Sequence, residues 1–148
     1  MTTTTSSDLQ NSSLAKLAIA GAVAGLGGGL VFGMLMGMMG MLPMVAMLVG
    51  SESALVGFIV HMAISALLGI IFGLGAARFL TGLGSAIVAG LVYGVIWWVL
   101  GALVLMPLML GMSQMVLAIG PDQWMSLVGH LIYGAITAGL FIPLSKQV

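Results

Sequence analysis

The sequence predicts an all-α integral membrane protein, a bundle of four membrane-spanning helices. Its 148 residues are 61% hydrophobic and only 4% charged, and the mean hydropathy is +1.31. Four apolar runs of roughly 21 to 28 residues each are long enough to cross a ~30 Å hydrocarbon layer with some tilt. Within the first run, glycine recurs at every fourth residue and therefore lies on one helical face.

Several classes of protein are excluded or left without support. A chain of this length allows one compact domain. It has no cysteine, which excludes disulfides, thiolate metal sites and cysteine nucleophiles. A formal net charge of zero gives no electrostatic reason to expect nucleic acid as a partner. No phosphate-binding loop, Ser-His-Asp set or nucleotide fingerprint can be placed, so the sequence has no evident catalytic site.

The first span follows a polar segment. Residues 1–13 are rich in Thr and Ser and predict a disordered cytoplasmic tail. The span begins near Leu14 and ends near Leu42, because Pro43 interrupts the helical hydrogen bonds. Its glycine face forms a groove about 24 Å long, and in lipid such small-residue faces bring helices together. The sequence therefore predicts a helix-packing glycine zipper at Gly21, Gly25, Gly29, Gly33 and Gly37.

The remaining spans follow from the other apolar runs. The second covers about 54–76, and the third covers about 84–106, where Pro107 ends the span as Pro43 ends the first. A second apolar segment, 108–119, precedes a turn at residues 120–122. The fourth span covers about 123–143, and residues 144–148 form a short cytoplasmic tail.

The charges predict the orientation. Four crossings place Lys16, Arg78 and Lys146 on one side of the membrane, and Glu52 and Asp122 on the other. By the positive-inside rule both termini are cytoplasmic, and we expect the protein in the cell (inner) membrane.

An internal repeat relates the two halves of the chain. The sequence GLVFG at 29–33 recurs as GLVYG at 90–94. Two matching series at four-residue steps are Gly57, His61, Ser65, Gly69 and Ser126, His130, Gly134, Ala138. We therefore expect two pseudo-repeated helical hairpins, 14–78 and 81–143, within one four-span domain, 14–143, with their pseudo-twofold axis along the membrane normal. Gly90 and Gly94 join the predicted packing glycines.

The two histidines of the chain, His61 and His130, lie inside the membrane at equivalent repeat positions. Both are roughly 12 to 14 Å from the outer helix ends, and an ionisable residue at that depth is a functional hypothesis by default. One interpretation is a cofactor site in which the two imidazoles ligate a haem iron. The alternatives are structural hydrogen bonds across helix interfaces and a path for protons or a solute.

Methionines crowd the outer ends of both hairpins. Of the fourteen in the chain, seven lie near the end of the first hairpin and five near the end of the second. Thioethers are soft ligands that suit Cu(I), and the candidate metal ligands are Met106, Met109 and Met112. The alternative is that methionine fills irregular gaps beside glycine-rich helices.

Two segments are similar to segments of known proteins: GLVYGVIWWVLGALVLMPLMLGM at 90–112 and LVGHLIYGAITAGLF at 127–141. In them the chain resembles small bacterial four-span membrane proteins of unknown function. The resemblance implies the four-span fold and no activity, so it assigns no functional residue.

The leading functional interpretation is an accessory or structural membrane subunit. Such a subunit would use exposed glycine faces to bind other helices, in a homo-oligomer or a larger membrane complex. One alternative is a haem-binding electron-transfer or sensing protein that uses His61 and His130. Another is a transporter of a soft metal or a small solute. None of these interpretations requires an enzyme.

Overall fold

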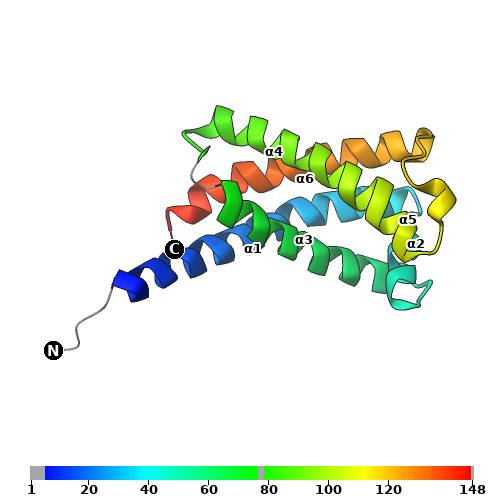
Figure 1. Cartoon of the computed structure of the whole chain (residues 1–148), viewed down its shortest axis with the longest axis horizontal. Coiled ribbons are helices and arrows are strands. Elements are labelled where there is room, and N and C mark those ends of the chain that lie inside the picture. The colour runs from blue at the N-terminus through cyan, green and yellow to red at the C-terminus, as the bar shows by residue number, and fades with distance from the viewer. Residues whose placement is uncertain (1–5, 77–78, 148) are drawn as a thin grey trace.

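A computed structural model describes residues 6–76 and 79–147 as a bundle of helices (Figure 1). Four segments are long and apolar enough to cross a membrane, which confirms the prediction of an all-α, multi-pass membrane protein. They are Ser13–Met38, Ala54–Ala76, Leu83–Met109 and Pro121–Ser145. The long helices that provide them are α1 (Ser6–Met38), α3 (Ala54–Ala76), α4 (Leu83–Trp97) and α6 (Pro121–Ser145).

The helices lie where the spans were expected, but several limits differ. Helix α1 ends at Met38, before Pro43, which lies in the first turn of α2 instead, and Pro107 lies inside α5 and does not end the third span, which continues to Met109. The second span has the expected limits, Ala54–Ala76. Helix α1 begins at Ser6, within the segment expected to be a tail, and residues 1–5 of that segment lie outside the described residues. Helix α6 begins at Pro121, because a proline is favourable in the first turn, where its missing N–H has no helical partner.

The third span is not a regular α-helix throughout. After α4 the chain continues as a π-helical segment, η3 (Trp98–Leu105), and then as the short helix α5 (Met106–Met109). The apolar segment expected at 108–119 contains turns and one 3₁₀ turn, η4 (Ser113–Met115). Its counterpart in the first hairpin consists of α2 (Leu42–Ala46) and η1 (Met47–Val49).

Figure 1 shows how these elements are arranged. The four long helices run along the long axis of the molecule, and both ends of the described chain lie at one end of the bundle. Helices α2 and α5 lie together at the opposite end. The short elements of the two hairpins therefore meet at one end, which we call the loop end.

Each hairpin is held together by glycines that leave no room for a side chain. In the first hairpin, a Cβ on Gly21 would overlap the carbonyl oxygen of Gly69, and a Cβ on Gly69 would overlap that of Gly21. In the second, Gly90 and Gly134 are related in the same way. The backbones of α1 and α3, and of α4 and α6, are therefore in direct contact, as small residues allow in lipid.

The two hairpins join through α1 and α6. Gly28 of α1 lies against Tyr133 and Thr137, and Gly129 of α6 lies against the ring of Phe32. On the other side of the bundle, α4 reaches α3 through a long side chain, since the Tyr93 hydroxyl donates a hydrogen bond of 2.6 Å to a carbonyl oxygen of α3. The first interface brings backbones close together, whereas the second is bridged by an aromatic ring.

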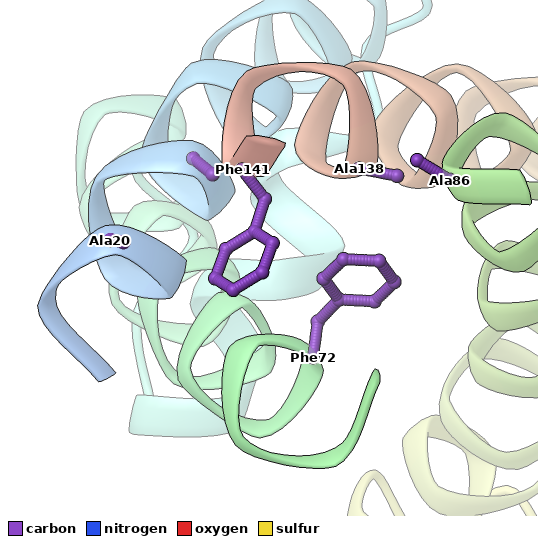
Figure 2. Close-up of a cluster of buried hydrophobic side chains, with 6 residues drawn as sticks. Ala20, Phe72, Ala86, Ala138 and Phe141 are labelled. Atoms are coloured by element: carbon purple, nitrogen blue, oxygen red, sulfur yellow. The ribbon is translucent and has the colours of Figure 1, made fainter. Parts of the chain in front are cut away.

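One core cluster draws side chains from all four long helices (Figure 2). Phe72 and Phe141 are each 1% exposed, and their rings meet edge to face with centroids 5.8 Å apart. Alanines on α1, α4 and α6 surround them: Ala20, Ala24, Ala86 and Ala138. Because these alanines are small, two phenylalanine rings can fill the space between four helices at the density of a protein interior.

Candidate functional site

The structure brings the two histidines together, around one aromatic ring. His61 on α3 and His130 on α6 each contact Phe32 of α1, with ring centroids 5.3 and 4.9 Å from that ring. Both contacts are edge-on, with interplanar angles of 89° and 64°. The two positions that the predicted repeat makes equivalent therefore lie close together in the bundle, whereas nothing in the sequence indicated the part of Phe32.

Each histidine donates a hydrogen bond to a backbone carbonyl. His61 Nε2 lies 2.9 Å from the oxygen of Gly29, and His130 Nδ1 lies 2.7 Å from the oxygen of Ser126. A carbonyl oxygen can only accept, so these two ring nitrogens carry the protons. The His61 bond joins α3 to α1, whereas the His130 bond stays within α6. The alternative of structural hydrogen bonding therefore has direct geometric support at His61.

A small cavity lies beside the histidines. Its volume is about 60 Å³, and it is lined by Phe32, His61, Ile64, Ser65, Leu68, His130 and Tyr133. The Tyr133 hydroxyl donates a bond of 2.7 Å to the carbonyl oxygen of Ser65 and so connects α6 to α3 beside it. Sites for cofactors and other small molecules are usually about 300–1,000 Å³. This space suits a few water molecules, and a haem would have to displace Phe32.

A much larger cavity lies at the loop end, between the two hairpins. Its volume is about 520 Å³. Methionines from both hairpins form much of its lining: Met39, Met41, Met44, Met106, Met112, Met115 and Met125. Of the three predicted metal ligands, Met106 and Met112 line this methionine cavity, whereas Met109 is not among its lining residues and is 68% exposed. For the other five methionines that line the cavity, the sequence contained one indication, which was the crowding of methionine at the outer ends of both hairpins.

The π-helical segment shapes one wall of the methionine cavity. Ala102 and Leu103 of η3 line it. A π-helix leaves carbonyl groups without their usual α-helical partner, and the oxygen of Leu103 accepts a hydrogen bond of 2.9 Å from the N–H of Leu117. This bond fastens the loop that follows α5 to the wall. Isolated π-helical turns are frequent at functional sites, so this wall supports a functional role for the cavity.

Polar groups enter the methionine cavity from the start of α6. Asp122 and Gln123 line it, and Asp122 lies in the first turn of α6, where a carboxylate is favoured by the helix dipole. The indole N–H of Trp98 donates a bond of 2.9 Å to the carbonyl oxygen of Gln123, and its ring stacks on Trp124 with centroids 6.0 Å apart. The third span and the start of α6 are thus fixed to each other.

Leu117 in the loop has a backbone conformation that glycine prefers. Its φ is +58°, and its side chain is 58% exposed, so little packing offsets the strain. We expect Leu117→Gly to stabilise the protein by about 1 kcal/mol, since a left-handed conformation costs an L-residue about that much. Thermal unfolding in detergent should show a higher midpoint. A lower midpoint would mean that the leucine side chain contributes more than its exposure indicates.

Neither groups of metal-binding side chains nor comparisons with known proteins identify the site further. Among the described residues, no three or more His, Cys, Asp or Glu side chains form a group that could hold a metal ion. No protein-family model, no curated protein and no solved structure matches the chain.

Proposed function

We propose that this multi-pass membrane protein is a binding or transport component whose ligand occupies the methionine cavity. The observation that carries this proposal is the size and position of that cavity. At about 520 Å³ it lies within the usual range for small-molecule sites, and it is formed by both hairpins at the end where they meet. The histidine pair, with about 60 Å³ beside it, has no comparable space.

The contacts of the packing glycines support a role in holding this chain's own helices together, as a scaffold for the cavity, rather than a role in docking other proteins. Gly21, Gly25, Gly29 and Gly33 are each in contact with α3, and Gly90 and Gly94 with α6. A glycine zipper of this kind is used within the chain. A subunit that recruits other helices would need a different surface, since these faces are occupied.

The contacts within the two hairpins support the internal repeat. Gly29 meets Ser65 in the first hairpin, and the equivalent Gly90 meets Gly134 in the second. In the same way, Gly33 meets His61, and Gly94 meets His130. Residues that the repeat makes equivalent thus have equivalent partners. Two copies of one hairpin would place two methionine-rich ends side by side, which is what a shared cavity requires.

The positive-inside rule supports an orientation in which the methionine cavity lies on the outer face of the membrane. Lys16 and Lys146 are exposed near the ends of the described chain, at the end of the bundle opposite α2 and α5 (Figure 1). Asp122 belongs to the loop end, and Arg78 lies outside the described residues. With positive charges inside, both termini are cytoplasmic and the cavity faces the exterior of a bacterial inner membrane.

Native mass spectrometry of protein extracted gently from its own membrane tests the proposal. The wild type should carry a bound mass, and Ala102→Phe, which puts a ring into the cavity wall, should lose it. Ala63→Phe is the matched control, because Ala63 is exposed on α3 and is not among the residues that line the cavity. A wild type without a bound mass, or a bound mass that survives in Ala102→Phe, would contradict the proposal.

A further inference from the structure

We propose that the ligand of the methionine cavity is a soft monovalent cation, Cu(I) or its chemical mimic Ag(I), held by thioether sulfurs from both hairpins. This inference rests on the proposed function and names the ligand class for the same site. Seven methionines line the cavity, and thioethers favour Cu(I) over harder cations. The other side chains there with metal-binding atoms are the carboxylate of Asp122 and the amide of Gln123.

The donor set disfavours the common divalent ions. Mg²⁺ and Ca²⁺ require several oxygen ligands, and Zn²⁺ is bound by thiolate, imidazole and carboxylate groups. The described residues contain no group of three or more His, Cys, Asp or Glu that could hold a metal ion. A neutral thioether does not offset a double charge, whereas one carboxylate at Asp122 balances a single one.

The methionines come from separate parts of the chain that the fold brings together. Met39, Met41 and Met44 belong to the turn after α1 and to α2, whereas Met106 begins α5 and Met112 lies in the turn that follows it. Gly40, with φ at +68°, lets the first turn reverse between Met39 and Met41. A cation bound between these groups would therefore join the two hairpins at the loop end.

The alternative role of methionine, which is to fill irregular gaps between helices, does not explain the methionines that line the cavity. Methionine that fills gaps in a core leaves little free space around it, yet about 520 Å³ remains among these residues. Met44, Met115 and Met125 are 42%, 39% and 51% exposed. Their sulfurs are thus on side chains that are accessible from outside and free to change rotamer around an ion.

The test is titration of the full-length protein in detergent with Ag(I), and with Cu(I) kept reduced by ascorbate, each against a competing chromophoric chelator. Saturable binding is expected for the wild type. The triple variant Met41→Leu, Met106→Leu, Met112→Leu, which keeps side-chain volume, should bind at least about 100-fold more weakly. The matched control replaces Met34, Met38 and Met109, which are 53%, 78% and 68% exposed and do not line the cavity, and should bind as the wild type does.

A second variant keeps the test decisive if the triple variant does not fold. Asp122→Asn removes the negative charge and leaves every thioether in place, and it should weaken Ag(I) binding several-fold, more at low than at high ionic strength. Equal binding by the wild type and the triple variant, or no saturable binding at all, would overturn the inference. If Ala102→Phe loses an organic bound mass while Ag(I) never binds, the proposed function stands and the choice of a soft cation is wrong.

Discussion

Gly69→Ala and Gly90→Ala should each lower the free energy of unfolding by about 3 kcal/mol, whereas Gly75→Ala and Gly84→Ala should raise it by up to about 1 kcal/mol. The same methyl group is added to the same two helices, α3 and α4, in both cases. The opposite signs are expected because the first pair faces the backbone of a neighbouring helix and the second pair faces open space.

The contacts at the first pair give the physical reason. A Cβ on Gly69 would overlap the carbonyl oxygen of Gly21 and lie 2.8 Å from the Cα of Gly25. A Cβ on Gly90 would overlap the carbonyl oxygen of Gly134. Backbone atoms cannot move aside as the end of a side chain can, so the two helices must separate and lose their contact along several turns.

Unfolding of the purified protein by SDS titration, followed by circular dichroism, would measure these four changes. At Gly75 and Gly84 nothing lies within 4 Å of the added atom, so only the higher helix propensity of alanine remains. Equal effects at all four positions would mean that the glycine contacts do not determine the packing of the bundle.

The sequence was sufficient to predict the spans but not the way in which the two hairpins meet. Hydropathy and the four-residue spacing of glycine identify helices and their small-residue faces. They do not say which helix each face meets. Gly28 and Gly129 lie between the hairpins, and nothing in their spacing separates them from the glycines that lie within a hairpin.

The sequence predicted only part of the methionine cavity at the loop end, because hydropathy and spacing do not show where a helix is interrupted. A regular helix through residue 112 would put Met106, Met109 and Met112 near one another, three residues apart. Instead α5 ends at Met109, and Gly111, with φ at +70°, turns the chain. Met112 therefore reaches the methionine cavity from the turn, whereas Met109 is left outside it. The π-helical segment before α5 has no signature in the hydropathy pattern.

The proposed repeat is not reproduced at the interface between hairpins, and the sequence gives the reason. Gly28 and Gly129 allow α1 and α6 to approach closely. The positions that the repeat makes equivalent to them are Ala89 on α4 and Val60 on α3, which are larger. The corresponding pair of helices is instead bridged by Tyr93. Small residues at Gly28 and Gly129 thus accompany the close interface, and larger residues at Ala89 and Val60 accompany the bridged one.

The histidines provide the second large expected effect. His61→Ala should lower the free energy of unfolding by about 3 kcal/mol, since it opens a cavity in a buried site and removes a bond between helices. His130→Ala should cost less, about 1 kcal/mol, because it removes a ring contact with Phe32 and a hydrogen bond that stays within α6, but no hydrogen bond between helices. His61 is 7% exposed, and its bond of 2.9 Å to the oxygen of Gly29 joins α3 to α1.

His61→Phe separates packing from hydrogen bonding. It keeps a ring of similar size in contact with Phe32 and removes only the donor, so the expected loss is about 1 kcal/mol. SDS titration measures all three variants, and an absorbance spectrum of each tests the haem hypothesis on the same samples. Two axial ligands of one iron would be equally necessary, so a Soret band in the wild type that disappears in His61→Ala and His130→Ala alike would contradict a structural role. Unequal losses of stability in a colourless protein are the result that the hydrogen bonds lead us to expect, because only one of the two imidazoles forms a hydrogen bond between helices.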